Sequence, residues 1–139
     1  MPALESSLAV GGKAFAENAA RMLERVQEFR ALEQKIVAAS DGEAPKFARR
    51  GQLLPRERIA RLLDRGAPFL ELASLAGLGM HDDDGKRSVM GGGGIHGIGF
   101  IAGKRCLVAA SDSAIKGGTV APMGLRKSLR SQEIAMRQK

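Results

Sequence analysis

The stretch that says most about the fold is Ser111-Asp-Ser-Ala-Ile-Lys-Gly-Gly-Thr-Val-Ala-Pro-Met-Gly-Leu-Arg-Lys-Ser-Leu-Arg130. It continues the short apolar segment 105–111, which predicts a strand buried on both faces. Past the glycines, Thr119 offers a hydroxyl N-cap and Pro122 suits the first turn of a helix, so a helix is predicted from about Val120 onward. The stretch therefore joins a strand to a basic helix through a glycine loop.

That loop carries a single lysine, Lys116, next to two adjacent glycines. Backbone N–H groups at a helix start, glycines that permit close approach and a lysine charge together favour a bound anion such as a phosphate. The alternative is a connecting turn without a ligand, and the spacing of the residues does not separate the two.

The amino-acid sequence of the loop and helix resembles that of the carboxyltransferase (beta) subunits of biotin-dependent acyl-CoA carboxylases. These subunits carry a similar Lys-Gly-Gly-Thr loop and a Leu/Arg/Lys-rich helix that ends in Gln-Glu-Ile-Ala, here 132–135. A second block, 50–72, is close to the family's Arg-Gly-x-Leu-Leu-Pro-Arg-Glu-Arg-Ile pattern. The resemblance covers most of the chain from Phe47 onward. Arg65 and Ser113 depart from the pattern, but neither removes a polar group that the loop would need.

The resemblance implies an α/β fold, in which an N-terminal helical arm precedes the start of a crotonase-like (ClpP/crotonase) domain. We expect residues 1–66 to form the arm and a short helix, and residues 67–139 to form the incomplete beginning of the N-terminal carboxyltransferase domain. Family members are several times longer, which makes this chain the expected first quarter of a subunit. The final helix pattern agrees, because it reaches the last residues without a Gly or Pro stop signal.

The implied activity is transfer of CO2 from carboxybiotin to the α-carbon, or vinylogous carbon, of an acyl-CoA. Gly118-Thr119 followed by Pro122-Met123 is nearest to the methylcrotonyl-CoA and geranyl-CoA carboxylase types. The expected CoA-binding residues form the glycine loop: Ser113, Ala114, Ile115, Lys116, Gly117, Gly118 and Thr119. No catalytic residue is expected within the chain, because the family's oxyanion donors would lie beyond Lys139, so we expect the 139 residues to be inactive alone.

The implied partners are the acyl-CoA substrate, a biotin-carrying alpha subunit and further beta subunits in a homo-oligomer. Carboxybiotin would arrive on the alpha subunit, so no cofactor is expected to bind this segment directly, and no metal site is predicted.

Composition fits one ordinary domain, with 44% hydrophobic and 27% charged residues among 139. No run approaches the roughly 18 apolar residues of a membrane span, and residues 1–5 lack a secretion signal. We expect a cytoplasmic protein, or a mitochondrial matrix protein in a eukaryote. The single Cys106 is expected to be a small buried hydrophobe.

The net charge of +7 also permits a small standalone basic protein that binds nucleic acid or scaffolds an assembly. Aromatic stacking residues are missing from the basic clusters, and no zinc or helix-turn-helix signature is present, which disfavours nucleic acid. The clusters are Arg49, Arg50, Arg56, Arg58, Arg61 and Arg65, then Arg126, Lys127 and Arg130.

The first half of the chain predicts two helices. A stripe of apolar residues at helical spacing predicts a long helix over about 13–39, with Pro45 preventing its resumption. Glu33 interrupts the heptad, so we expect the stripe to pack on this subunit or a neighbour instead of forming a coiled coil. A second helix is expected between Pro55 and Gly66, with an apolar side formed by Ile59, Leu62 and Leu63 and a surface pair between Glu57 and Arg61.

The second half predicts a short strand at 69–72, a mobile loop over 77–94 and a β-hairpin from 95–101 through 102–104 to 106–110. Because a strand follows Gly92, Gly94 and Gly97, their dinucleotide-binding pattern is rejected. Three consecutive aspartates, 82–84, lack calcium-loop spacing. His81 and His96 are expected to be exposed or satisfied by hydrogen bonds.

Overall fold

The computed structural model describes residues 7–80 and 89–138. Its contacts divide the chain into two compact units, Met1–Leu32 and Glu33–Lys139. The domain boundary that the sequence predicts between residues 66 and 67 does not coincide with this division and stays a prediction. The calcium reading of 82–84 and the role of His81 fall outside the described residues.

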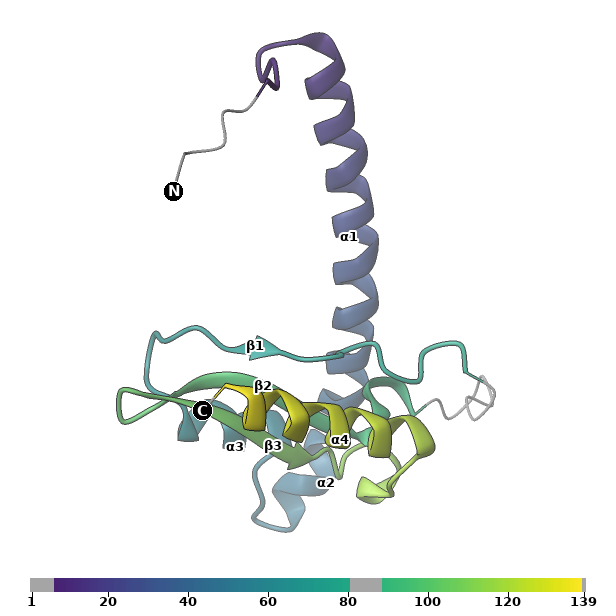
Figure 1. The fold of residues 1–139 in the computed structure, drawn as a ribbon. Coiled ribbons are helices and arrows are strands. Elements are labelled where there is room, and N and C mark those ends of the chain that lie inside the picture. Colours follow the sequence, from purple (N-terminus) through teal and green to yellow (C-terminus); the bar gives the residue numbers. More distant parts are fainter. Residues whose placement is uncertain (1–6, 81–88, 139) are drawn as a thin grey trace. The chain divides into compact units, whose positions relative to one another are not determined.

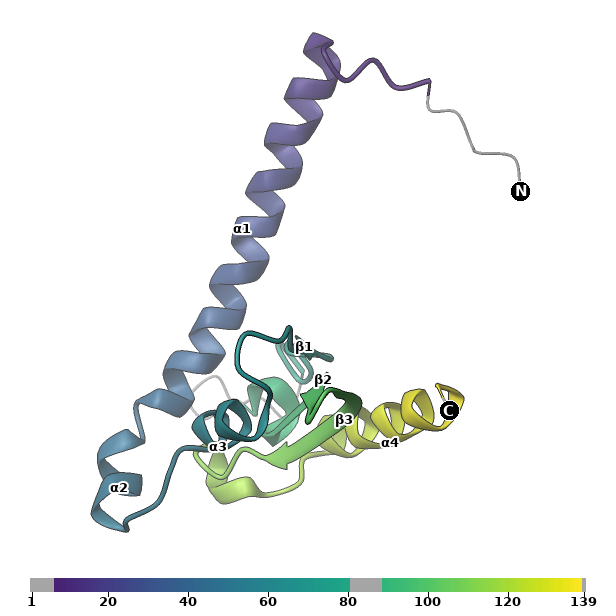
Figure 2. The same ribbon diagram turned by 90° about the vertical axis from the view of Figure 1, so that its left-hand side faces the viewer.

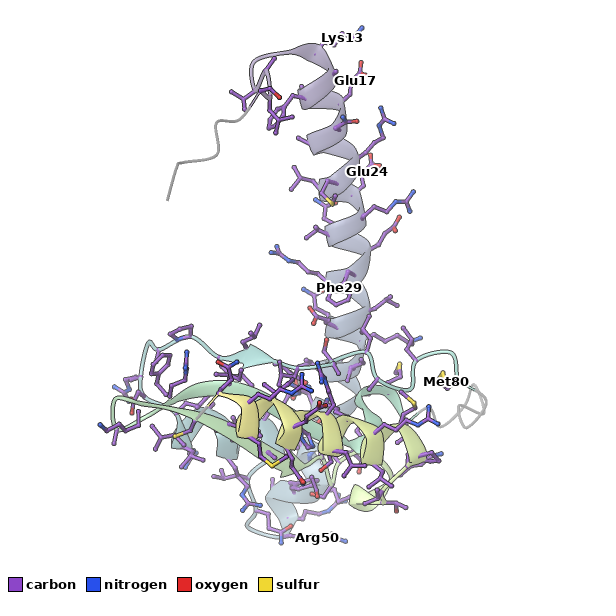
Figure 3. The ribbon with its side chains drawn as sticks, viewed as in Figure 1. Lys13, Glu17, Glu24, Phe29, Arg50 and Met80 are labelled. Carbon is purple, nitrogen blue, oxygen red and sulfur yellow. The ribbon has the colours of Figure 1, made fainter. Side chains whose placement is uncertain are left out.

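The first unit contains the start of helix α1 (Lys13–Asp41), which confirms the long helix predicted from the apolar stripe. Its large apolar side chains are solvent-exposed, Met22 at 64% and Phe29 at 47%. Figure 3 shows the side chains of Lys13, Glu17 and Phe29 projecting from the helix. Ion pairs one turn apart, such as Lys13 with Glu17 at 3.8 Å, each contribute only a few tenths of a kcal/mol.

The second unit is built around a three-stranded antiparallel sheet in the order β1-β2-β3. Strands β2 and β3 form the predicted hairpin, with Gly94 opposite Ser111 and Ile101 opposite Lys104. The elements, following the end of α1, are α2 (Ala44–Arg49), α3 (Pro55–Leu62), β1 (Leu70–Glu71), the 3-10 turn η1 (Met90–Gly93), β2 (Gly94–Ile101), β3 (Lys104–Ser111), the 3-10 turn η2 (Lys116–Gly118) and α4 (Pro122–Arg137).

Helices α3 and α4 lie on opposite faces of the hairpin (Figures 1 and 2). The α3 face holds the buried core of Ile59, Ile95 and Val108. Gly97 and Gly99 on β2 admit the larger core side chains: a Cβ at Gly97 would lie 2.3 Å from Phe69 Cζ. The alternation of glycine with isoleucine in β2 is thus a packing requirement of this face.

Asp64 fixes the far end of the hairpin. Its carboxylate oxygens accept hydrogen bonds from the backbone N–H groups of Ala102 at 2.8 Å and Gly103 at 2.7 Å. Its own N–H donates to Phe100 O at 2.8 Å. The aspartate that follows α3 therefore acts as a clamp on the turn between β2 and β3.

Several expectations for the helices are wrong. Pro45 does not prevent a helix; it lies in the first turn of α2, where the missing N–H costs nothing. Leu62 is 51% exposed instead of inward, because α3 ends there and Ile59 already fills the core position. Glu57 accepts a hydrogen bond from Leu54 N at 3.1 Å, and in the described residues it forms no ion pair with Arg61.

The prediction that segment 105–111 is buried on both faces is also wrong. In β3 only Val108 is buried; Ala109 is exposed and Cys106 is half-buried against the core. One face meets α3, while the other is only partly covered by α4. None of the helices within residues 7–80 and 89–138 combines the length and apolar character of a membrane span.

Candidate functional site

Four consecutive glycines form an ordered turn at the start of β2. Gly91, Gly92 and Gly93 have φ of 74°, 67° and 68°, a left-handed conformation that glycine adopts without strain. The turn lies against α4: a Cβ at Gly92 would be 2.8 Å from Gly124 Cα, and a Cβ at Gly124 would be 2.1 Å from Gly92 O. The prediction of a mobile loop is therefore wrong for 91–94, because α4 packs directly on these backbones.

Lys127 holds this turn from α4. Lys127 is 4% exposed, and its Nζ donates to Gly91 O at 3.0 Å and to Gly94 O at 2.7 Å. Burial lowers the pKa of Lys127 to about 8. The sequence had placed this lysine in a basic surface cluster, and the structure corrects that assignment.

Asp112 connects the turn to the glycine loop and to the end of α1. It is 2% exposed, and its Oδ1 accepts from Ser40 Oγ at 3.1 Å and from Ala114 N at 3.3 Å. Its backbone N–H donates to Gly93 O at 2.9 Å. Burial raises the pKa of Asp112 above its ordinary value, against the opposing effect of these hydrogen bonds.

The expected CoA loop, 113–119, follows directly. Ile115 is buried, whereas Lys116, Gly117 and Thr119 are exposed and Ser113, Ala114 and Gly118 are half-buried. The ammonium of Lys116 has no hydrogen-bond or ion-pair partner among the described residues. Its backbone has a φ of 43°, and Gly117 and Gly118 continue the left-handed path.

Thr119 does not cap the helix as predicted. Its hydroxyl donates to Lys116 O at 2.9 Å, inside the loop, and α4 begins at Pro122 with Ala121 in the capping position. Thr119 and Ala121 both have extended backbone, and Thr119 lies three residues before Pro122, so its hydroxyl is not in the capping position.

A cleft of about 300 Å³ is lined by residues of the four-glycine turn, the β2–β3 hairpin, the loop and α4. From the expected loop, only Gly118 lines it; the other lining residues include Gly93, His96, Ser111, Leu125 and Ser128. Its lining is mainly glycine and alanine, with the hydroxyls of Ser111 and Ser128 and the larger side chains of His96, Val120 and Leu125.

His96 forms part of the wall and contradicts the expectation of a satisfied or exposed histidine. It is 9% exposed, and its Nδ1 is buried without a hydrogen-bond partner among the described residues. Burial, with the charge of Lys127 adding to it, lowers the pKa of His96 below its ordinary value. Both effects favour the neutral imidazole.

A second polar pair braces the opposite face of the sheet. Arg56 Nη1 and Nη2 donate to the two carboxylate oxygens of Glu71 at 2.7 and 3.1 Å, an arrangement typical of strong charge-assisted bonds. In the described part of the chain, no group of three His, Cys, Asp or Glu side chains lies close enough to hold a metal ion.

Sequence reasoning missed Ser40, Asp112, Lys127 and the order of the four-glycine turn. A buried lysine carries no local signal, since Lys127 lies in a run that reads as basic surface. One available signal was Gly124, a glycine inside a predicted helix, which often marks a close backbone approach.

Residues 46–139 match the model of the carboxyl transferase domain. The chain is 47% identical over 109 residues to the biotin-dependent 3-methylcrotonyl-coenzyme A carboxylase beta1 subunit of Mycobacterium tuberculosis, covering 76% of this chain and 20% of that protein. It is 44% identical over 126 residues to the mitochondrial methylcrotonoyl-CoA carboxylase beta chain of Arabidopsis thaliana, covering 90% and 21%.

Solved structures of carboxyltransferase subunits are also similar to this chain. The beta subunit of Pseudomonas aeruginosa geranyl-CoA carboxylase superposes with a TM-score of 0.85 at 58% identity, covering 97% of this chain and 25% of that one. Transcarboxylase 12S, described as a hexamer assembly, gives 0.72 at 25% identity, with 84% and 23% covered.

The chain thus spans between a fifth and a quarter of the length of these proteins. The expected α/β fold that begins a crotonase-like domain is confirmed by these structural neighbours. Because the domain model matches most of its length, the chain belongs to the carboxyl transferase domain family.

Proposed function

We propose that this chain is the N-terminal part of the carboxyltransferase (beta) subunit of a biotin-dependent acyl-CoA carboxylase. The subunit would transfer CO2 from carboxybiotin to the α-carbon, or vinylogous carbon, of an acyl-CoA. The observation that carries the proposal is the match of residues 46–139, joined to 58% identity with a geranyl-CoA carboxylase beta subunit. Methylcrotonyl-CoA and geranyl-CoA types are the proposed substrate classes, since both names occur among the relatives.

Within this chain the proposed task is to bind acyl-CoA, and residues 113–119 are the proposed contact. The support is geometric: Lys116 presents an ammonium that has no partner within residues 7–80 and 89–138, on a loop whose next two residues are glycines in the left-handed conformation. A lysine of this kind attracts a phosphate as a point charge, and the glycines permit backbone approach. The cleft beside Gly118 would receive a neighbouring part of the same ligand.

Carboxybiotin would be delivered by a biotin-carrying alpha subunit, and further beta subunits would complete a homo-oligomer. No residue of this chain is proposed to contact biotin or to act on the reacting carbon. A cytoplasmic or mitochondrial matrix location is part of this proposal, in keeping with the mitochondrial relative of Arabidopsis thaliana.

The test uses the full-length subunit with its biotin-carrying partner. Lys116→Ala should raise the KM for acyl-CoA by an amount equal to about 1 to 3 kcal/mol, the usual cost of losing a charge-assisted hydrogen bond. The value of kcat should change little, because the contact is remote from the reacting carbon. Lys104→Ala, on an exposed hairpin residue, is the matched control and should leave KM unchanged.

Using 3-methylcrotonyl-CoA, geranyl-CoA and propionyl-CoA side by side identifies the substrate class. Absence of acyl-CoA-dependent carboxylation with all three would refute the proposed activity. Unchanged KM in Lys116→Ala, with loss of assembly, would assign the lysine a structural role. Salt-sensitive binding of nucleic acid in place of acyl-CoA binding would instead support the standalone basic protein.

A further inference from the structure

Lys127 is unusual because it is a buried ammonium whose hydrogen bonds, in the part of the chain that the structure describes, all go to backbone carbonyl groups. Buried lysines are rare and are normally paired with a carboxylate. Among the described residues, the hydrogen-bond acceptors of Lys127 Nζ are Gly91 O and Gly94 O, the two ends of one turn. One turn further along α4, the Ser131 hydroxyl donates to Lys127 O at 2.8 Å.

Within itself, the turn that Lys127 bridges is closed by two backbone hydrogen bonds, from Gly92 N to Val89 O at 2.9 Å and from Gly94 N to Gly91 O. Glycine backbones lose more conformational entropy on folding than those of any other residue. Among the described residues, the turn is joined to the β3 side of the hairpin by the hydrogen bond from Asp112 N to Gly93 O and by the pairing of Gly94 with Ser111. The contact between Gly92 and Gly124 is close, but it is van der Waals contact and gives no direction to the carbonyls.

This turn forms one wall of the cleft, and Gly118 of the proposed CoA loop lies across from it. We propose that Lys127 is a positioning residue of the acyl-CoA site: by holding Gly91 O and Gly94 O, it fixes the shape of the cleft that receives the ligand. The inference rests on the proposed function, since it names a residue that prepares the same site without touching the ligand.

The experiment compares two variants of the full-length subunit. Lys127→Met keeps the length of the side chain and removes both hydrogen bonds. Asp64→Ala is the matched control, because it also removes two hydrogen bonds to backbone, but at the opposite end of the hairpin. Three quantities are measured for each: thermal stability, hydrogen exchange of the amides in 89–95, and the Kd for acyl-CoA.

Lys127→Met should speed exchange in 89–95 and raise the Kd by at least about tenfold, equivalent to about 1.4 kcal/mol. The value of kcat at saturating acyl-CoA should stay within about twofold, because the reacting carbon is not addressed. Asp64→Ala should lose stability with an unchanged Kd and unchanged exchange in 89–95. If Lys127→Met does not fold, Lys127→Gln, which retains one shorter donor, replaces it and should raise the Kd by about threefold or more.

The outcomes separate this inference from the function beneath it. If wild type binds acyl-CoA and the Lys127 variant binds it equally well, the positioning role is overturned while the function stands. An equal rise in Kd for Asp64→Ala would also overturn it, since the effect would then follow general loss of stability. If wild type does not bind acyl-CoA, the proposed function is wrong, and the positioning role is wrong with it.

Discussion

Replacing Gly124 by alanine sets helix propensity against packing. Gly124 lies in the first turn of α4, and alanine is favoured over glycine by up to about 1 kcal/mol inside a helix, so propensity alone predicts that Gly124→Ala stabilises α4. The structure predicts instead that Gly124→Ala lowers the stability. The new Cβ would lie 2.1 Å from Gly92 O, an overlap with backbone that no side-chain rotation relieves.

The magnitude follows from what must move. Overpacking of this kind costs about 1 to 3 kcal/mol. Displacing α4 also lengthens the two hydrogen bonds from Lys127 Nζ, each worth about 1 kcal/mol. Against a gain of about 1 kcal/mol from propensity, the net expectation is a loss of about 2 kcal/mol.

The assay is thermal unfolding of the full-length subunit, with hydrogen exchange in 89–95 as a local readout. Gly11→Ala is the control, since nothing lies within 4 Å of a Cβ there, and it should stay within about 0.5 kcal/mol of wild type. A Gly124→Ala protein as stable as wild type, with unchanged exchange in 89–95, would refute the close contact between α4 and the four-glycine turn.

Two further predictions concern single side chains. The folded-state pKa of Lys127, about 8, lies below its value of 10.5 in an unfolded chain, so the unfolded state binds more protons between these two pH values. The free energy of unfolding should therefore rise with pH across that window, by up to about 3 kcal/mol. Denaturant titrations from pH 7.5 to 10.5 should show this rise in wild type, and the same slope in Lys127→Met would contradict it. Asp64→Ala should lower the free energy of unfolding by about 1.5 to 3 kcal/mol, because two N–H groups lose a charged acceptor at an exposed turn. Asp64→Asn, which keeps one acceptor oxygen, should lose about half as much in thermal unfolding. If neither variant loses stability, Asp64 does not act as a clamp on the turn.

Local patterns in the sequence determined the elements of the fold well. The long helix, the short strand before the glycine region and the hairpin each have a periodicity or turn signal that belongs to their own residues. The resemblance carried by 50–72 and the glycine loop led to the family, which the domain match confirms. The assignment of 113–119 to CoA remains a prediction.

Tertiary structure alone decided which polar groups are buried and what they hold. Lys127 reads as surface charge beside Arg126 and Arg130, yet only Lys127 faces the four-glycine turn. Ser40 and Asp112 are 72 residues apart and meet in one hydrogen bond. The physical reason is that a helix or strand pattern reports the period of burial, whereas the identity of the facing atoms depends on how distant segments pack, which no local spacing encodes.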